Sequence, residues 1–384
     1  MQRIPLDPEK ATQFGHGPIV SFGNMLAERT PLKHATVVTV AELDAFDEVI
    51  DVRSPAEFAL DHVPQAVNCP VLDDAERAKV GTLYAQVSPF DAKKLGAALV
   101  SKNIARHIEE RFRGKEKSWR PLVYCWRGGQ RSGAMAHVLR QVGWDAATLA
   151  GGYRAYRREV LAQLEALPAR FNFRVVCGAT GSGKSRLLEA LSGAGAQVLD
   201  LERLASHRGS LLGGLPGEPQ PSQKMFDSLV WGALRRLDPA QAVFAEAESK
   251  KIGQLQVPSK LLERMREGEC LRLDVPSPER VRFLIAEYRH FLGEPRALEE
   301  KLRGLTTRYG HAVIERWLAQ VHAGAWEELV SDLLATHYDP AYLRATAQNY
   351  LNYEKARSIS LERLDLAAFE SAAARLAKPE LERA

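Results

Sequence analysis

The sequence predicts an α/β protein in which two domains with parallel β-sheets are followed by a helical extension. Short runs rich in β-branched residues alternate with helical patterns in the first half of the chain, as in a parallel sheet with crossover helices. The same alternation starts again at Phe173, and amphipathic helical patterns follow Pro278. A chain of 384 residues, 45% of them hydrophobic, is long enough for two domains that each bury a core.

The first domain is expected over residues 36–160. ATVVTV and EVIDV are typical of strands, with the helical AELDAF between them, and LVYC is a strand that leads into a helix from about Ser132. The strand-like AATLAGGY and the arginine-rich helix YRAYRREVLAQLEAL complete the domain. The segment PARFNF, near Pro168, marks the expected junction.

The second domain is expected over residues 170–384. It begins with the strand FRVVCG, the loop GATGSGKS and the helix SRLLEAL, and continues with strands at QVLDL, QAVFAEAE and CLRLDV. The patterns ERVRFLIAEY, ALEEKLRGL, AVIERWLAQV and AWEELVSDLL predict the helical extension. The segment GGLPGEPQPSQ, residues 213–223, is predicted to be a mobile loop.

Cysteine spacing and hydropathy restrict the class of protein. The four cysteines, Cys69, Cys125, Cys177 and Cys270, form no CxxC pair and no cluster at zinc spacing, so the sequence indicates neither a disulfide framework nor a structural metal. No run approaches the roughly eighteen apolar residues of a membrane span. The polar start MQRIPLDPEK lacks the apolar segment of a signal peptide. We therefore expect a cytoplasmic protein with no membrane partner.

Positive charge gathers in the part of the chain around Cys125. Residues 102–158 carry thirteen Lys and Arg against four Asp and Glu, a net charge of +9, whereas residues 1–101 have a net charge of −5. This distribution fits either a solvated basic helix or a surface that binds anions or nucleic acid.

Cys125 lies where the strand LVYC ends and WRGGQRSG leads into a helix. Backbone N–H groups converge at such a helix N-terminus, and Gly128 and Gly129 permit the tight turn that forms an anion cradle. Arg131, together with Arg127, adds positive charge that favours the thiolate. The sequence therefore predicts Cys125 and Arg131 as catalytic residues beside a pocket for a tetrahedral oxyanion. The predicted substrate-binding residues are Arg127, Gly128, Gly129 and Gln130.

The segment GATGSGKS matches the pattern G-x-x-x-x-G-K-[ST] between a predicted strand and a predicted helix, the context expected of a P-loop. Its backbone N–H groups are suited to wrap a diphosphate, Lys184 to contact the terminal phosphate oxygens, and the Ser185 hydroxyl to ligate Mg²⁺. The predicted phosphate-binding residues are Gly178, Gly181, Gly183, Lys184 and Ser185.

A Mg²⁺ cofactor is expected beside this loop. Ordinary P-loop NTPases place an Asp at the end of a hydrophobic strand, whereas QAVFAEAES ends in Glu246 and Glu248. Glu248 is predicted to ligate the metal with Ser185, and Glu246 and Asp200 are further candidates, the alternative being solvated carboxylates at strand ends. The P-loop therefore predicts diphosphate binding but does not establish ATP hydrolysis.

The segments VIDVRSPAEF, DHVPQAVNCP, CWRGGQRS and AGGY resemble a single rhodanese domain in their order and spacing. The resemblance implies that Asp51 and Arg53 buttress the fold, that Cys125 carries the chalcogen, and that Arg131 closes the loop. His62 falls in a structural motif of such domains. The other cysteines are expected to pack in strands, with a resolving thiol as the alternative role of Cys69.

The loop length leaves the reaction open, because five residues separate Cys125 from Arg131. This CxxxxxR spacing is also similar to the loops of tyrosine phosphatases and arsenate reductases. One alternative is therefore a phosphatase or arsenate-reductase-like enzyme whose P-loop senses a nucleotide. Two others are a non-catalytic tRNA-binding or sulfur-relay module and a small-molecule kinase.

A rhodanese domain followed by a P-loop domain resembles the tRNA 2-selenouridine synthase family. VGTLYAQ, LERLASHRGSLLG, QPSQKMFDSLVWGAL, EAESKKIG and YDPAY also look like this family. The resemblance implies an enzyme that converts 2-thiouridine at the tRNA wobble position to S-geranyl-2-thiouridine with geranyl diphosphate, and then to 2-selenouridine with selenophosphate. It implies tRNA, selenophosphate and the selenophosphate synthetase that supplies it as partners. We expect the P-loop to serve the first step and Cys125 the second.

A tRNA substrate requires basic and aromatic contacts. The arginine-rich segment 153–158 is a candidate, and Trp126 and Tyr153 are candidates for stacking on a base, with packing as the alternative. Further candidates are Arg264, Arg266, Arg303 and Arg308 for phosphates, and His207, Arg208 and Gln223 for the lining of the P-loop pocket.

Overall fold

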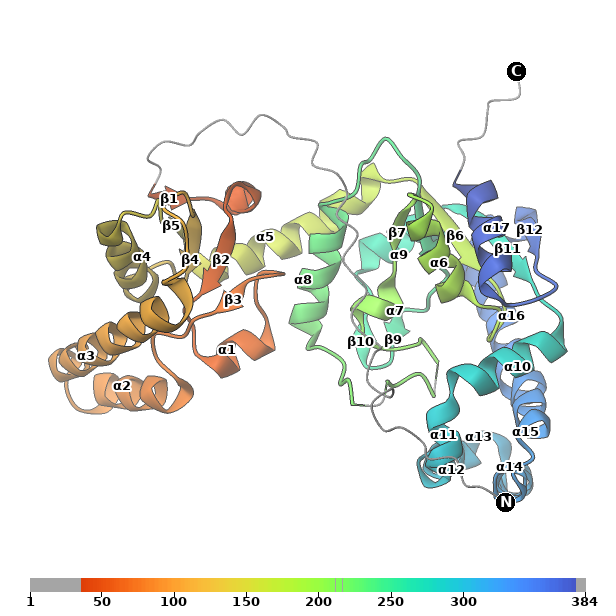
Figure 1. Cartoon of the computed structure of the whole chain (residues 1–384). Helices are drawn as coiled ribbons and strands as arrows, with labels where there is room; N and C mark the ends of the chain where they lie inside the picture. The colour runs from red at the N-terminus through yellow and green to blue at the C-terminus, as the bar shows by residue number, and fades with distance from the viewer. Residues whose placement is uncertain (1–35, 211, 216, 378–384) are drawn as a thin grey trace, which may run out of the picture. The chain divides into compact units, whose positions relative to one another are not determined.

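The structure, a computed structural model, describes residues 36–210, 212–215 and 217–377 of the 384-residue chain. It contains two five-stranded parallel sheets with the strand orders β1-β5-β4-β2-β3 and β12-β11-β6-β8-β7 (Figure 1). The predicted α/β class is confirmed. The polar start of the chain and residues 378–384 lie outside the described residues, and the boundaries of the two domains stay predictions.

The first sheet is built around strand β4, which is buried along its whole length. β4 pairs in parallel with β2 and β5, and β1 and β3 form the edges. Asp51 and Tyr124 are partners at the carboxyl ends of β2 and β4, so Cys125, the next residue, leaves the sheet at this edge. The elements are β1 (Val37–Val38), η2 (Val40–Ala45), β2 (Glu48–Asp51), α1 (Pro55–Leu60), β3 (Val67–Asn68), α2 (Asp74–Gln86), α3 (Pro89–His107), η3 (Ile108–Phe112), β4 (Pro121–Tyr124), α4 (Gln130–Val142), β5 (Ala147–Leu149) and α5 (Gly152–Ala166).

The second sheet places β6 between β11 and β8, again in parallel. The glycine-rich loop leaves the carboxyl end of β6, and Glu246 ends the neighbouring strand β8 opposite Val176. Because the carboxyl ends of parallel strands meet at one edge, the topology brings the loop and this carboxylate together. The elements are η4 (Leu167–Arg170), β6 (Phe173–Cys177), α6 (Lys184–Gly193), β7 (Gln197–Leu199), α7 (Leu201–Leu204), α8 (Gln223–Leu234), β8 (Val243–Glu246), β9 (Lys251–Ile252), β10 (Leu255–Gln256), α9 (Ser259–Arg266) and β11 (Glu269–Asp274).

The predicted helical extension follows β11 and continues to Lys355. Its helices bury a cluster of their own, in which Trp317 is completely enclosed by leucine, valine and aromatic side chains. This packing gives the extension a core that depends on neither sheet. The helices are α10 (Ser277–Glu287), α11 (Arg289–Gly293), α12 (Pro295–Arg303), α13 (Thr306–Tyr309), α14 (His311–Ala323), α15 (Trp326–Leu333), η5 (Leu334–Tyr338), α16 (Asp339–Asn349) and η6 (Tyr353–Lys355).

The end of the described chain returns to the second sheet with a strand that the sequence analysis did not predict. Strand β12 (Arg357–Ser360) pairs in parallel with β11, and helix α17 (Leu366–Leu376) packs against α6. Ile359 is the one buried residue of β12. An edge strand of four residues with one buried side chain shows no alternation of apolar and polar residues. The sequence therefore carries no sign of this strand.

Packing joins the two sheets through helices α5 and α8. Tyr156 of α5 lies edge-on to Trp231 of α8 with ring centroids 5.4 Å apart, and the Trp231 indole N–H donates to Gln163 Oε1 at 2.8 Å. Arg157 forms an ion pair with Asp227 next to these rings. One cluster of buried apolar residues includes members of both sheets. The segments on either side of Pro168 therefore share a core as well as a linker.

Asp51 and Arg53 form a fully buried ion pair beneath the first sheet, with the contacts that a buttress of the fold requires. Arg53 Nε donates to both oxygens of the Asp51 carboxylate at 3.0 Å, and Arg53 Nη2 donates to the carbonyl of Asp61 at 2.6 Å. The guanidinium also lies 4.0 Å from the centroid of the Tyr153 ring. The pair thus ties β2 to the segment after α1 and to α5.

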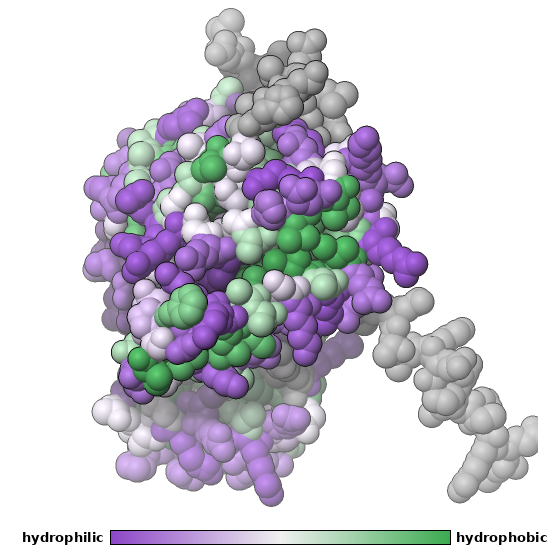
Figure 2. Space-filling view, turned by 90° about the vertical axis from the view of Figure 1, so that its left-hand side faces the viewer, coloured by the Kyte–Doolittle hydropathy of each residue, from purple (hydrophilic) through white to green (hydrophobic). Residues whose placement is uncertain are grey.

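One face of the molecule carries mainly polar side chains (Figure 2). Figure 2 shows one face, on which hydrophilic residues predominate and hydrophobic residues gather in limited areas. Among the helices of the described residues, none combines the length and the apolar character needed to cross a membrane.

Replacing Arg53 with Met is expected to lower the free energy of unfolding by roughly 3–5 kcal/mol, because Asp51 would keep a buried charge without its partner. Chemical denaturation monitored by tryptophan fluorescence measures the change. Arg113→Met, on the exposed arginine after η3, is the matched control and should change stability by less than about 0.5 kcal/mol. Equal stability of the two variants would contradict the prediction.

Candidate functional site

Cys125 lies at the base of the loop between β4 and α4, where its side chain is 4% exposed. The Gly129 backbone N–H donates to its Sγ atom at 3.4 Å, and the Ser132 hydroxyl donates to the same atom at 3.2 Å. Gly128 adopts a φ of +66°, which turns the loop back toward the thiol. The predicted cradle of backbone donors around Cys125 is therefore present.

The pKa of the Cys125 thiol lies below its usual value. Burial raises this pKa, but the hydrogen bond from the Ser132 side chain and those from the backbone N–H groups of Ser132, Gly129 and Arg127 outweigh that effect. Hydrogen bonds to sulfur favour the charged form of the thiol because they stabilise a thiolate more than a thiol. Neutral donors around the sulfur, not arginine charges, account for the lowered pKa.

Two close backbone approaches explain the glycines of GGQ and AGGY. A Cβ atom on Gly152 would lie 2.3 Å from the Cys125 carbonyl oxygen and 2.4 Å from the Gly128 nitrogen. A Cβ atom on Gly128 would lie 2.6 Å from the carbonyl oxygen of Leu149. The cysteine loop and the start of α5 therefore interlock, and any side chain at either glycine would force them apart.

The sequence suggested that Arg131 would face the Cys125 thiolate, but in the structure its partner is Glu57. Its Nη1 atom donates to Glu57 Oε2 at 3.0 Å, and this contact helps to lower the pKa of the Glu57 carboxyl against the effect of burial. Arg127 and Gln130 are exposed at the rim of the loop. Ser132, which the sequence analysis did not single out, supplies the side-chain donor instead. A hydroxyl residue in the first turn of the helix after the loop is the signal that could have identified it.

The two aromatic candidates near this loop differ in exposure. Trp126 stacks on Tyr153 with ring centroids 5.2 Å apart, and its side chain is 37% exposed. Tyr153 is buried, and its hydroxyl donates to Asp61 Oδ2 at 2.7 Å. Of the pair, Trp126 is the ring that a base could reach, while Tyr153 supports it from below.

The remaining cysteines are buried in the two sheets. Burial raises the pKa of the Cys69 thiol to about 11, which disfavours the thiolate that a resolving thiol would need. Cys177 and Cys270 neighbour each other on β6 and β11 beneath the P-loop. The hydrogen bond with Cys177 lowers the pKa of the Cys270 thiol, whereas at Cys125 backbone and hydroxyl donors of the loop do so. His62 packs its ring on Phe58 with centroids 3.7 Å apart, in agreement with a structural role.

The P-loop joins β6 to α6, which begins at Lys184. Gly181 and Gly183 adopt φ values of +81° and +78°, and a Cβ atom on Gly178 would lie 2.5 Å from Ser182 Oγ. The Lys184 ammonium donates to the carbonyl of Gly178 at 2.9 Å, so its side chain folds back over the loop. The glycines and the lysine thus have the conformations that a phosphate-binding loop requires.

Three carboxylates gather beside this loop. Oxygen atoms of Glu202, Glu246 and Glu248 lie within 4.8 Å of one another. The Ser185 hydroxyl donates to Glu202 Oε2 at 2.8 Å and to Glu246 Oε2 at 3.4 Å. The predicted metal ligands Ser185 and Glu248 therefore meet Glu246, the further candidate. Asp200 instead accepts from the Arg203 backbone N–H and caps α7.

Glu202 is the member of this group that the sequence analysis missed. It follows β7 by three residues, and only the pairing of β7 with β8 brings it next to Glu246. Its backbone N–H donates to Glu246 Oε1 at 3.0 Å. Its place beyond the carboxyl end of a predicted strand was the available signal.

The carboxylates fit a divalent cation because they repel one another in a buried position. Burial raises the pKa of Glu246, and the charges of Glu202, Asp200 and Glu248 raise it further. Burial and the charge of Glu202 raise the pKa of Glu248 to about 8. Mg²⁺ prefers oxygen ligands of this kind. Ser185 and the three glutamates would hold it, and the ion would supply positive charge to a bound diphosphate.

Both sites lie in segments that match known families. Residues 39–159 match the rhodanese-like domain, and residues 171–306 match the tRNA 2-selenouridine synthase AAA domain. The tRNA 2-selenouridine synthase of Alcanivorax borkumensis is 32% identical over 326 residues, which cover 77% of this chain and 88% of that protein. The chain belongs to the tRNA 2-selenouridine synthase family.

Other relatives give the same family. The tRNA 2-selenouridine synthase of Bdellovibrio bacteriovorus is 30% identical over 343 residues, which cover 79% of this chain and 90% of that protein. The tRNA 2-selenouridine synthase of Nitrosomonas europaea is 36% identical over 244 residues, but this match spans 62% of this chain and 63% of the relative. A rhodanese-related protein from Thermoplasma volcanium aligns with 32% of this chain and 91% of its own at 19% identity and a TM-score of 0.21.

In this member of the tRNA 2-selenouridine synthase family, the loop after α7 contacts the carboxylate cluster. Burial raises the pKa of the Glu202 carboxyl, and the positive charge of Arg208 opposes this rise in part. Arg208 also pairs with Glu287 at 3.3 Å. A Cβ atom on Gly209 would lie 2.4 Å from Glu202 Oε1. Gln223, the first residue of α8, instead donates hydrogen bonds to Asp227 and to the carbonyl of Gln256. Arg208 is therefore near the P-loop site, whereas the hydrogen bonds of Gln223 are structural.

Ser132→Ala is expected to raise the pKa of the Cys125 thiol, because it removes the side-chain donor that stabilises the thiolate. The rate of iodoacetamide alkylation at Cys125, followed by peptide mass spectrometry from pH 5 to 10, should therefore reach half its maximum at a higher pH. Ser101→Ala, an exposed serine of α3, is the matched control. An unchanged or lower midpoint for Ser132→Ala would show that the hydroxyl does not stabilise the thiolate.

Glu202→Gln and Glu246→Gln are each expected to weaken Mg²⁺ binding by about ten-fold or more, because each removes one charged ligand. Substitution of residues that merely hydrogen-bond to metal ligands already lowers metal affinity by about ten-fold. The metal-free variants should also resist heat better than the parent, because one of three mutually repelling carboxylates is gone. Calorimetric titration and thermal unfolding measure the two effects. Glu263→Gln, exposed on α9, should change neither. Unaltered Mg²⁺ affinity in both variants would rule out the cluster as the metal site.

Proposed function

We propose that this protein converts 2-thiouridine at the wobble position of tRNA to 2-selenouridine through an S-geranyl-2-thiouridine intermediate. Geranyl diphosphate and selenophosphate are the co-substrates. The observation that carries the proposal is the presence of two different anion sites in a chain of this family. One surrounds a thiol of lowered pKa with backbone donors, and the other combines a P-loop lysine with buried carboxylates.

The first step is assigned to the P-loop. The sulfur of 2-thiouridine forms a bond to C1 of the geranyl group while the bond from C1 to oxygen breaks, and diphosphate leaves with the electron pair. Negative charge grows on the departing diphosphate, so donors and cations already held around it lower the barrier. Lys184 and the backbone N–H groups of residues 178–185 supply these donors.

The second step is assigned to the Cys125 loop. Selenium of selenophosphate forms a bond to C2 of the base as geranylthiolate leaves. The Cys125 thiolate takes the phosphoryl group as the bond from phosphorus to selenium breaks, and water then releases phosphate from the sulfur. The phosphate oxygens suit the backbone donors of Gly128 and Gly129. Cys125 is the proposed nucleophile at the base of this cradle, and Arg127, Gln130 and Arg131 are the proposed side chains at its rim.

The alternative of a CxxxxxR phosphatase or arsenate reductase has less support. Such an enzyme uses the arginine at the end of its loop to hold the oxyanion against the cysteine. Arg131 instead pairs with Glu57, and neutral donors lower the pKa of Cys125. The arginine that such an enzyme would use therefore already has a carboxylate partner.

The tRNA is expected to contact the start of α5 beside the cysteine loop. Arg154 is exposed there, and its backbone N–H donates to the carbonyl of Trp126 at 3.1 Å. Other arginines suggested for tRNA already serve the fold: Arg157 pairs with Asp227, and Arg264 donates to the carbonyl of Phe171 at 2.9 Å. We propose Trp126 and Arg154 as contacts for the base and a phosphate.

The partners that follow from this function are tRNA, selenophosphate and the selenophosphate synthetase that makes it. We place the reaction in the cytoplasm, where these partners would be available. No membrane partner is proposed.

Two variants are expected to block different steps. Lys184→Ala should slow geranylation on the order of a hundred-fold or more, the loss found when one donor to a developing anion is removed. Cys125→Ser should accumulate S-geranyl-2-thiouridine without 2-selenouridine, because the thiolate is absent. Mass spectrometry of nucleosides from thiolated tRNA, incubated with enzyme, Mg²⁺ and both co-substrates, separates the products.

Matched controls for these variants are Lys260→Ala on the exposed face of α9 and Cys69→Ala in the first sheet. Both should retain the two steps. Normal geranylation by Lys184→Ala would remove the P-loop from step one, and normal selenation by Cys125→Ser would remove the thiol from step two. A wild-type protein that leaves thiolated tRNA unchanged would refute the proposed function as a whole.

A further inference from the structure

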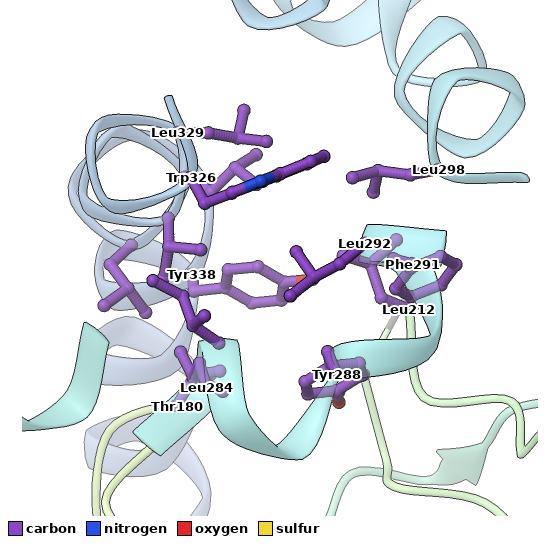
Figure 3. Close-up of a pocket in the computed structure, with 15 residues that line it drawn as sticks. Thr180, Leu212, Leu284, Tyr288, Phe291, Leu292, Leu298, Trp326, Leu329 and Tyr338 are labelled. Carbon is purple, nitrogen blue, oxygen red and sulfur yellow. Dashed lines mark hydrogen bonds between the residues drawn. The ribbon is translucent and has the colours of Figure 1, made fainter. Parts of the chain in front are cut away.

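The helical extension encloses an apolar cavity next to the P-loop. Leucine and aromatic side chains from α10, α11, α12, α15 and η5 line it (Figure 3). Figure 3 shows Tyr338 extending across the middle of this space, with Leu284 and Thr180 on one side of it and Leu298 and Trp326 on another. Almost no polar surface faces the interior. A cavity of this kind favours a hydrocarbon ligand over a polar one.

Contacts with the P-loop show that the cavity lies directly beside the phosphate site. Thr180, within the P-loop, lines the cavity. A Cβ atom on Gly181 would lie 2.8 Å from the side chain of Leu284, so the loop backbone touches the cavity wall. Arg280 Nη1 donates to the Thr180 carbonyl at 3.2 Å and pairs with Asp339, which fixes α10 and α16 against the loop. A ligand held by its phosphates in the P-loop therefore has an apolar space beside it.

We propose that this cavity binds the isoprenoid chain of a prenyl diphosphate whose diphosphate lies in the P-loop. The inference rests on the proposed function for the diphosphate and adds the place and length of the chain. A nucleotide would need polar partners for its ribose and base. The hydroxyls of Ser210 and Tyr288 lie 3.3 Å apart and bond to each other. A branched hydrocarbon chain, in contrast, fills a site walled by leucine and aromatic rings without leaving a polar group unpaired.

The far wall of the cavity sets the length of the chain. Leu298, Trp326 and Leu329 lie across the cavity from Thr180 (Figure 3). Leu298 and Leu329 are buried in the core of the extension, whereas Trp326 is partly exposed. The indole of Trp326 is therefore the part of this wall whose removal would lengthen the cavity toward solvent.

Binding of diphosphates of increasing chain length tests the inference without tRNA. Full-length protein with Mg²⁺ is titrated calorimetrically with inorganic diphosphate and with the dimethylallyl, geranyl and farnesyl diphosphates. Affinity should rise on the order of ten-fold for each of the first two isoprene units, because each fills apolar space, and should not rise further for farnesyl. Leu298→Trp should remove the gain from the second unit, and Trp326→Ala should make farnesyl diphosphate the tightest ligand.

Leu351→Trp, at an exposed leucine outside the cavity, is the matched control and should bind all four ligands as the parent does. Affinity for inorganic diphosphate should be equal in every variant. Thermal unfolding checks that each variant is folded, and Trp326→Ala alone decides the test if Leu298→Trp does not fold.

Two outcomes would overturn the inference while the proposed function stands. In one, geranyl diphosphate binds no more tightly than inorganic diphosphate although the enzyme still transfers its geranyl group to tRNA. In the other, both cavity variants keep the chain-length order of the parent. A protein that binds neither inorganic diphosphate nor geranyl diphosphate would instead refute the P-loop step of the proposed function, and the chain site with it.

Discussion

Asp61 is a buried carboxylate that residues of α5 and α8, on either side of Pro168 in the sequence, both contact. It accepts hydrogen bonds from the Tyr153 hydroxyl and the Ser228 hydroxyl, each at 2.7 Å, and its carbonyl accepts from Arg53. A buried carboxylate without such donors would strongly destabilise the fold. Loss of any of these three contacts would therefore cost stability. Tyr153 in turn donates its backbone N–H to the Cys125 carbonyl at 2.8 Å. The position of the cysteine loop therefore depends on a contact that also includes α8.

The two sites use the same backbone arrangement for different chemistry. Each follows a central strand of a parallel sheet and precedes a helix, so backbone donors converge on an anion at the carboxyl edge of the sheet. Around Cys125 the donors are neutral and act on the sulfur itself. Beside Lys184 three carboxylates lie close together, with Glu246 buried and Glu202 and Glu248 part-buried, and burial and their mutual repulsion raise the pKa of Glu246. The first arrangement stabilises a thiolate, and the second is suited to a cation.

The helical extension is part of the P-loop site. The Tyr342 hydroxyl accepts a hydrogen bond from the Gly178 backbone N–H at 2.5 Å, and Arg280 bonds to the carbonyl of Thr180. The first contact comes from α16 and the second from α10. Helix α10 thus holds the loop in its conformation and, through Leu284, also forms part of the cavity wall. This arrangement links the binding of a phosphate group to the shape of an apolar space.

The sequence by itself determined the two loops, because each is a contiguous motif whose glycines and flanking elements fix the local backbone. Cys125, Lys184 and Ser185 could therefore be predicted as site residues, and most strands and helices with clear periodicity could be located. Only the tertiary structure decided which distant residues meet these loops. The pairing of β7 with β8 brings Glu202 to Glu246, and the packing of α1 against the cysteine loop gives Arg131 the partner Glu57. The cavity, too, is formed by side chains from separate helices, and no spacing along the chain encodes their approach.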